Sequence, residues 1–178
     1  DAAKGKVLYD ANCVRCHGEK GDGEGPDAGN MYPKPRNFTT GLFKFKTSAF
    51  KEKRPLDRDL YQTVSDGLPG SAMPAWKSSL SIGDRKDVIA YVKQLAKISG
   101  EATDKVSMAG WVPPTAKNLK KGKKLFLSRC SACHGEAGRG DTTMALEDEW
   151  GGRVWPRNFT KFYSFRIGNA PMEIFQRI

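Results

Sequence analysis

Apolar residues fall in short runs along this chain, and the longest uninterrupted apolar run covers only residues 88–92. Apolar positions at helical spacing predict helices over 5–11, near 57–66 and near 84–97 in the first hundred residues. Ser81 or Asp84 can cap the last of these helices. Gly- and Pro-rich stretches between the helices are typical of irregular loops. A five-residue apolar run cannot cross a bilayer, so the sequence predicts no integral membrane segment.

The sequence contains an internal repeat. The segment KGKVLYDANCVRCHGEKGDG at 4–23 matches KGKKLFLSRCSACHGEAGRG at 121–140, and PRNFT occurs at 35–39 and again at 156–160. Further on, DLYQTV at 59–64 corresponds to EIFQRI at 173–178. These matches predict two homologous units in tandem. We expect a first domain over 1–99, a Gly- and Pro-containing linker over 100–116 and a second domain over 117–178.

The second unit is shorter than the first. Ile178 is the counterpart of Val64, after which the first unit continues through DGLPGSAMPAW at 66–76 and a further helix. We therefore expect the second domain to lack its C-terminal part here and the complete protein to continue beyond Ile178. The chain opens on DAAKGK, without a basic-then-apolar leader, and we expect it to be the mature form of an exported protein.

Composition places the chain among globular proteins. It has 178 residues, 38% hydrophobic content and a mean hydropathy of −0.59. The formal charge is +10, with +5 on each side of residue 100, so the positive charge is not confined to a tail. Such a surface suits acidic protein partners, anionic membranes or nucleic acid. A nucleic-acid partner is not expected, because no known nucleic-acid-binding motif occurs and the lysines are not grouped with stacking aromatics.

All four cysteines lie in two identical frames, CVRCH at 13–17 and CSACH at 130–134. C-x-x-C alone fits a redox dithiol, half of a zinc site or a haem anchor. The only two histidines directly follow these pairs. C-x-x-C-H is the attachment signature of c-type haem, in which two thiols bond the porphyrin and the adjacent imidazole lies under the iron. A zinc- or disulfide-stapled binding module remains the alternative, although 113 residues separate the two pairs.

Together with the helix before each motif and the segment GLPGSAMPAW, these motifs resemble the class I cytochromes c. The resemblance covers nearly the whole chain and implies a mainly α fold of two tandem cytochrome c domains, each wrapped around a covalently attached haem c. It implies that the following residues hold the two haems: Cys13, Cys16 and proximal His17 with distal Met73 in the first unit, and Cys130, Cys133 and proximal His134 in the second.

The sequence also offers candidate residues around the haems whose roles it leaves open. Arg36 and Arg157, at matching places in PRNFT, are candidates to pair with haem propionates, because a guanidinium offers two donors to a carboxylate. Trp76 is a candidate to pack on the haem edge. In the family a proline carbonyl accepts the proximal histidine Nδ1–H, and the sequence offers Pro26, Pro33 or Pro35. The distal ligand of the second haem is a methionine beyond Ile178 or, alternatively, Met144, Met172, water or a partner residue.

These features predict an electron carrier that passes single electrons between redox proteins. The PRNFT region looks similar to dihaem cytochromes that serve molybdenum oxidoreductases acting on nitrate or nitrite, or terminal oxidases. A dihaem peroxidase with an open second haem is the alternative from the enzyme class. The resemblance implies a periplasmic or equivalent extracytoplasmic location and leaves the oligomeric state open.

Overall fold

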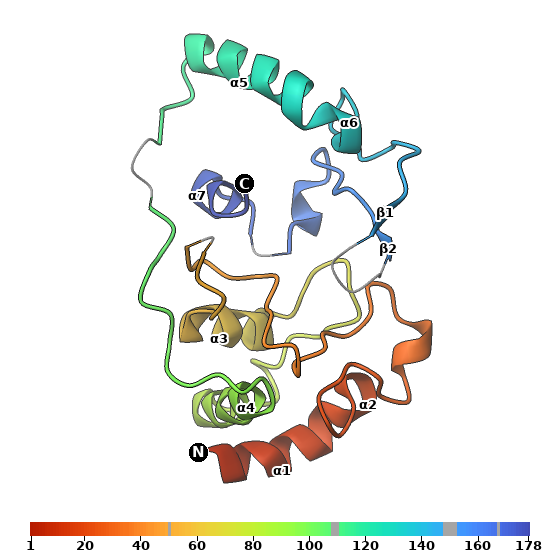
Figure 1. Ribbon diagram of the computed structural model, residues 1–178, viewed down its shortest axis with the longest axis vertical. Coiled ribbons are helices and arrows are strands. Elements are labelled where there is room, and N and C mark those ends of the chain that lie inside the picture. The colour runs from red at the N-terminus through yellow and green to blue at the C-terminus, as the bar shows by residue number, and fades with distance from the viewer. Residues whose placement is uncertain (50, 108–110, 148–152, 167) are drawn as a thin grey trace. The chain divides into compact units, whose positions relative to one another are not determined.

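The computed structural model describes residues 1–49, 51–107, 111–147, 153–166 and 168–178. Helices make up most of the regular structure in this described part (Figure 1). The chain divides into two compact units, unit 1 with Asp1–Ser107 and Gln176–Ile178, and unit 2 with Met108–Phe175. The division after residue 107 falls inside the segment 100–116 expected to be a linker. The limits set from the sequence for the two domains stay a prediction.

Unit 1 is built mainly from helices that precede and follow a long loop. Its elements are α1 (Ala2–Asn12), α2 (Val14–His17), the 3-10 turn η1 (Ala28–Asn30), α3 (Asp57–Asp66) and α4 (Ile82–Leu95). The bounds of α3 are those that the sequence predicts, 57–66.

The other two helices differ from the sequence prediction at their ends. α1 begins at Ala2, the second residue of the chain, because the Asp1 carboxylate accepts hydrogen bonds from two N–H groups of the first helical turn. α4 spans Ile82–Leu95 instead of 84–97 because Ser81 is its cap. The Ser81 hydroxyl accepts from the Asp84 N–H, and the Asp84 carboxylate accepts from the Ser81 N–H, both at 3.1 Å. Lys97 then adopts a left-handed φ of 53°, which ends the helix.

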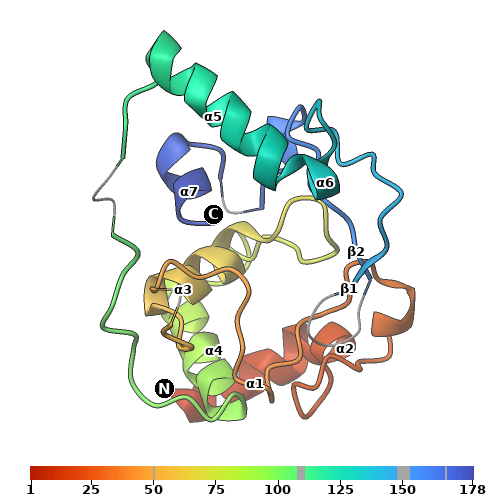
Figure 2. The ribbon, with the colours of Figure 1, turned by 45° about the horizontal axis from the view of Figure 1, so that its top comes forward.

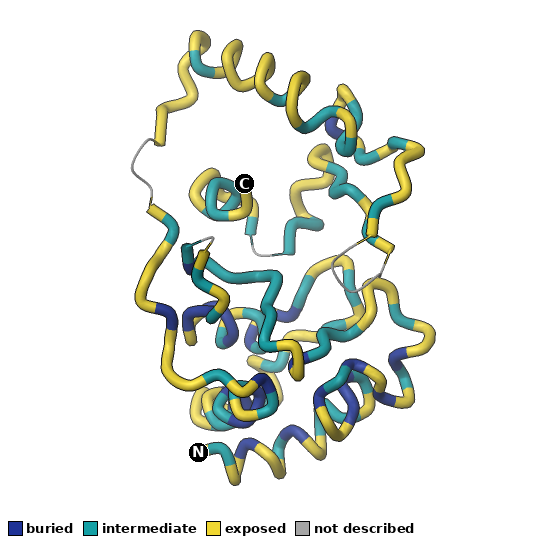
Figure 3. The backbone as a smooth tube through the Cα atoms, viewed as in Figure 1, coloured by how far each residue is buried: buried dark blue, intermediate teal, exposed yellow. Residues whose placement is uncertain are grey.

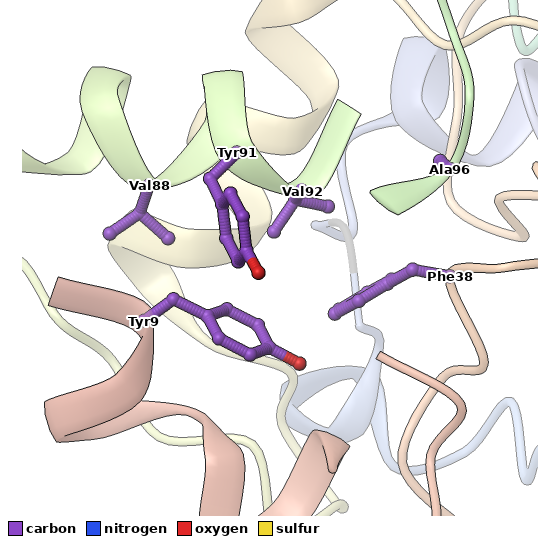
Figure 4. Close-up of a cluster of buried hydrophobic side chains, with 6 residues drawn as sticks. All are labelled: Tyr9, Phe38, Val88, Tyr91, Val92 and Ala96. Carbon is purple, nitrogen blue, oxygen red and sulfur yellow. The ribbon is translucent and has the colours of Figure 1, made fainter. Parts of the chain in front are cut away.

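The core of unit 1 lies where α1 packs against α4 (Figures 1 and 2). Tyr9 is fully buried, and its ring meets Tyr91 edge-on at 5.2 Å between centroids (Figure 4). Gly5 lets the two helices approach, since a Cβ there would overlap the Asp87 carbonyl. The same core takes in Phe38, from the first PRNFT segment. The segment after the haem motif is thereby fixed to the two helices.

A buried carboxylate joins α3 to the preceding loop. Asp59 is 6% exposed and accepts hydrogen bonds from the N–H and hydroxyl of Thr47, both at 2.8 Å, and from the N–H of Leu56. Ser48 forms an isolated antiparallel bridge with Lys105. Part of the segment 100–116 therefore packs on the loop of unit 1.

Unit 2 repeats the first part of this arrangement. Its elements are α5 (Ala116–Arg129), α6 (Ser131–His134), a two-stranded antiparallel sheet of β1 (Leu146–Glu147) and β2 (Arg153–Val154), the 3-10 turn η2 (Phe162–Ser164) and α7 (Pro171–Phe175). α7 begins at the counterpart of Asp57 in the internal alignment. Among the described residues, no helix in either unit is long and apolar enough to cross a membrane.

Candidate functional site

The backbone of the two C-x-x-C-H motifs makes the same hydrogen bonds in both units. The Cys13 N–H donates to Tyr9 O at 2.8 Å at the end of α1, and the His17 N–H donates to Cys13 O at 2.9 Å. In unit 2 the bonds from Cys130 to Phe126 O and from His134 to Cys130 O have lengths of 2.8 and 2.9 Å. One helix thus runs directly into a second short helix, with the first cysteine at the junction and the second cysteine and the histidine inside the short helix.

Each imidazole is held by one main-chain carbonyl. His17 Nδ1 lies 3.0 Å from Arg36 O, and His134 Nδ1 lies 3.1 Å from Arg157 O. A carbonyl can only accept, so Nδ1 carries the proton and the lone pair of Nε2 is left for a metal. His17 is 9% exposed, and its burial lowers the pKa of its imidazole below the usual value. The ring is therefore in the neutral form that a metal ion requires.

The expectation that a proline carbonyl accepts from His17 Nδ1 is wrong. None of Pro26, Pro33 and Pro35 supplies the acceptor for His17 Nδ1, which comes from Arg36, one residue after Pro35. The Pro35 carbonyl instead faces Gly23, where a Cβ would lie 2.7 Å from its oxygen.

Two phenylalanines that the sequence reasoning missed stack on the histidine rings. Phe38 stacks on the His17 ring at 4.5 Å between centroids and 19° between planes, and Phe159 stacks on His134 at 4.2 Å and 25°. Both are the fourth residue of a PRNFT segment. The repetition of the whole pentapeptide was the signal that could have found them, because an arginine contact alone does not require the following Asn-Phe-Thr.

The asparagine of each PRNFT segment shapes the turn. In unit 1 the Asn37 side-chain oxygen accepts from the N–H and hydroxyl of Thr39, at 2.9 and 2.7 Å. In unit 2 Asn158 makes the same two bonds to Thr160, at 2.9 and 2.6 Å. PRNFT is thus a unit that presents one carbonyl and one aromatic ring to the proximal histidine.

The four thiols are free and half-buried. Burial raises the pKa of Cys13 to about 11 and also raises that of Cys16. Helix α2 is tied to the start of η1 by Arg15, whose guanidinium makes two bonds to Asp27 at 2.8 and 3.0 Å. In unit 2 the counterpart of Arg15 is Ala132, so this ion pair is not repeated, and the Cys133 thiol instead donates to the sulfur of Met144 at 3.7 Å.

The Met73 loop closes on the end of α3. The Leu68 N–H donates to Met73 O and the Trp76 N–H donates to Val64 O, each at 3.1 Å. Gly67 has a φ of 67°, and a Cβ there would lie 2.7 Å from Met73 O. Met73 and Trp76 are both half-buried. The loop therefore fixes the backbone of Met73 from two sides.

The family model described as cytochrome c matches residues 2–96 and again residues 119–169. The chain belongs to the cytochrome c family. As a tandem cytochrome c it carries covalently bound haem c, and the two matched segments with their two attachment motifs correspond to two haems. The alternative of a zinc- or disulfide-stapled module is therefore wrong.

The chain is similar to several known cytochromes and subunits of redox complexes. The cytochrome is 35% identical to a solved chain of the reducing HAO-like protein complex Kustc0457/Kustc0458 of Kuenenia stuttgartiensis, with a TM-score of 0.87 over 98% of this chain and 80% of that chain. It is 36% identical to cytochrome c-554(547) of Halothiobacillus neapolitanus over 53% of this chain and 97% of that relative. It is 26% identical to the cbb3-type cytochrome c oxidase subunit FixP of Azorhizobium caulinodans over 86% of this chain, but spans 44% of that relative's length.

The donor set fits haem c in both units. Free thiols are what thioether attachment needs, and an imidazole with a free Nε2 is an axial iron ligand. Arg36 and Arg157 are half-buried and contribute their carbonyls to the histidines, while the pairing of their guanidinium groups with propionates stays a prediction. The packing of Trp76 on the haem edge also stays a prediction.

Proposed function

We propose that this cytochrome passes single electrons between redox proteins, with Cys13 and Cys16 attaching one haem and Cys130 and Cys133 the other. His17 and His134 would be the proximal ligands. The observation that carries the proposal is the pair of matched settings in which a carbonyl holds each Nδ1 and a phenylalanine covers each ring. When bound, haem iron supplies a reversible one-electron couple. The chain's own residues orient the imidazoles and restrict the access of water.

Met73 is proposed as the distal ligand of the first haem. Its thioether is a soft donor, and methionine with histidine ligation raises the potential of c-type haems. The closed backbone of the loop supports the assignment, since it limits the positions that the sulfur can reach. The proposed distal ligand of the second haem is a methionine that follows Ile178, with Met144, Met172, water or a partner residue as the alternatives.

The relatives suggest where the electrons go. The names of the oxidase subunit FixP and the reducing HAO-like complex support a role as an electron-transferring subunit or close partner of a larger redox complex. Of the two partners expected from the sequence, a molybdenum oxidoreductase and a terminal oxidase, the name of FixP favours the oxidase. Because C-x-x-C-H haems are attached outside the cytoplasm, we place the function in the periplasm or an equivalent compartment.

The test uses the chain produced with a c-type haem maturation system. Intact mass should show two added haems, and a redox titration of the 550 nm region should show two reversible one-electron steps. Met73→Ala should convert one ferric haem from low spin to high spin and lower its potential, whereas the control Met172→Ala should leave the first haem low spin. A high-spin first haem in the parent chain would refute the Met73 assignment. Rapid peroxide turnover would instead favour the peroxidase alternative.

A further inference from the structure

Phe38 connects the proximal histidine of unit 1 to the hydrophobic core. Its ring lies nearly parallel to the His17 imidazole, at 4.5 Å between centroids and 19° between planes. The same ring lies nearly parallel to that of Phe43, at 6.1 Å and 17°. The three rings therefore share nearly one orientation, and we call them the ring stack. Phe38 is also a member of the buried cluster around α1 and α4 (Figure 4).

The fold fixes the plane of the Phe38 ring. The Phe38 N–H donates to Gly21 O at 2.6 Å, and a Cβ on Gly21 would lie only 3.2 Å from the ring carbon Cδ2. Phe43 contacts the ring and packs against the same buried cluster. Phe38 is 9% exposed, and close packing in a protein interior holds side chains in one rotamer. The orientation of this ring is thus set independently of the histidine.

Unit 2 repeats the contact with the histidine but not the surroundings of the phenylalanine. Phe159 stacks on His134, and its N–H donates to Gly138 O at 2.7 Å. Its other aromatic neighbours, Phe126 and Phe165, meet it edge-on, at 66° and 76° between planes. Phe159 is 41% exposed, and Figure 3 shows the buried positions gathered on the helices of unit 1, whereas α5 is mostly exposed. The ring over His134 is therefore held less firmly than the ring over His17.

A fixed neighbouring ring restricts the one rotation that a ligating histidine keeps. An imidazole that binds a metal through Nε2 can turn about that bond. The hydrogen bond from His17 Nδ1 to Arg36 O limits this turn, but hydrogen bonds accept a broad range of angles at a carbonyl oxygen. A nearly parallel ring in contact with the imidazole blocks more of the rotation, because a turn of the imidazole moves its edge into Phe38. Groups around a metal ligand orient it in this way and tune the metal.

We propose that Phe38, supported by Phe43, is the positioning residue that fixes the plane of the His17 imidazole, and that the imidazole of His134 has more rotational freedom. The inference rests on the proposed function, in which His17 binds the iron of the first haem, and adds which side chains orient that ligand. A ligand plane that is the same in both oxidation states keeps the structural change on electron transfer small. It also determines which edge of the haem carries most of the unpaired electron.

The experiment measures the proton NMR shifts of the haem methyl groups in the ferric, haem-loaded chain. A fixed imidazole plane spreads the four methyl shifts of one haem apart, and rotation of the ring averages them. Phe38→Met keeps an apolar side chain of similar size but removes the flat ring, so the spread of the first haem should narrow. Phe43→Met should narrow it less, and Phe38→Tyr, which keeps the ring, should retain the parent spread. Cys130→Ala/Cys133→Ala, which cannot attach the second haem, assigns the remaining signals to the first.

Val88→Ala is the control that separates positioning from packing. Val88 is 2% exposed and belongs to the same buried cluster, but it lies away from Phe38 and outside the ring stack (Figure 4). Its truncation loosens the core and should leave the methyl shifts unchanged. Phe159→Met should change only the signals of the second haem.

Two results would overturn the positioning role. One is an unchanged spread in Phe38→Met, and the other is equal narrowing in Phe38→Met and Val88→Ala. If Phe38→Met does not fold, Phe43→Met is compared with Val88→Ala in the same way and decides the question. If the first haem of the parent chain gives no low-spin ferric signals, the proposed ligation itself fails and the inference fails with it. Low-spin signals with an unchanged spread would overturn the inference alone.

Discussion

The close crossing of α1 and α4 predicts that Gly5→Ala destabilises unit 1, although alanine is the better helix former. A methyl group at residue 5 would lie 2.6 Å from the Asp87 carbonyl carbon and 3.0 Å from Tyr91 Cβ. Carbon atoms in favourable contact are about 3.5–4.0 Å apart, so the helices must separate by roughly 1 Å, which removes a quarter to a half of the dispersion energy across the contact. Overpacking of this kind costs about 2–3 kcal/mol, so after the gain of about 1 kcal/mol in helix propensity we expect a net loss of about 1–2 kcal/mol.

Amide hydrogen exchange of the haem-loaded chain, read by mass spectrometry, resolves this loss by segment. Protection of α1 and α4 should fall by about 5- to 30-fold where exchange follows the opening of these helices. Gly122→Ala is the matched control, because Gly122 is the counterpart of Gly5 and a Cβ there meets no described atom within 4 Å. The control should leave protection of α5 unchanged or raised. Unchanged or raised protection of α1 and α4 in Gly5→Ala would refute the reasoning.

Three further outcomes are expected. Phe38→Ala should lower the free energy of unfolding of unit 1 by about 3–5 kcal/mol, while Phe159→Ala, at a residue 41% exposed, should have a clearly smaller effect in the same denaturant titration. Tyr9→Phe should lower the free energy of unfolding by about 1–3 kcal/mol because the main-chain carbonyl that accepts from the buried hydroxyl at 2.8 Å loses its partner. The Arg15 guanidinium lowers the pKa of Asp27, so their pair stabilises the fold above the ordinary aspartate pKa and is lost as pH falls through the lower folded value; Arg15→Gln should therefore reduce stability at pH 7 and have no effect at pH 2, and an equal effect at both would contradict this.

Local signals in the sequence account for much of the fold. The bounds of α3 could be predicted because its apolar positions repeat at helical spacing between loop-forming segments. The ends of α1 and α4 differ from the prediction by one to three residues because caps such as Ser81 act through hydrogen bonds that spacing alone does not rank. The cysteines and histidines were found because the chemistry of haem attachment requires them within one short segment.

The surroundings of the histidines could not be predicted in the same way. The acceptor for His17 depends on the direction of a single peptide group, that of Arg36, which lies 19 residues further along the chain. The ring of Phe38 lies between the histidine and the core, and an isolated phenylalanine in a sequence does not specify either contact. Both features follow from tertiary structure, and only the exact repetition of PRNFT pointed to them.

The two PRNFT segments also define a site where the chain tolerates insertion. Eleven residues separate Gly23 from Pro35 in unit 1, and fifteen separate Gly140 from Pro156 in unit 2, yet the same carbonyl and ring reach the histidine in both. Closing the longer loop costs only about 0.3 kcal/mol more by the logarithmic dependence of closure entropy on length. A reporter peptide or an electrode-binding tag could therefore be placed between these anchor points, beside a redox centre, without altering how its proximal histidine is held.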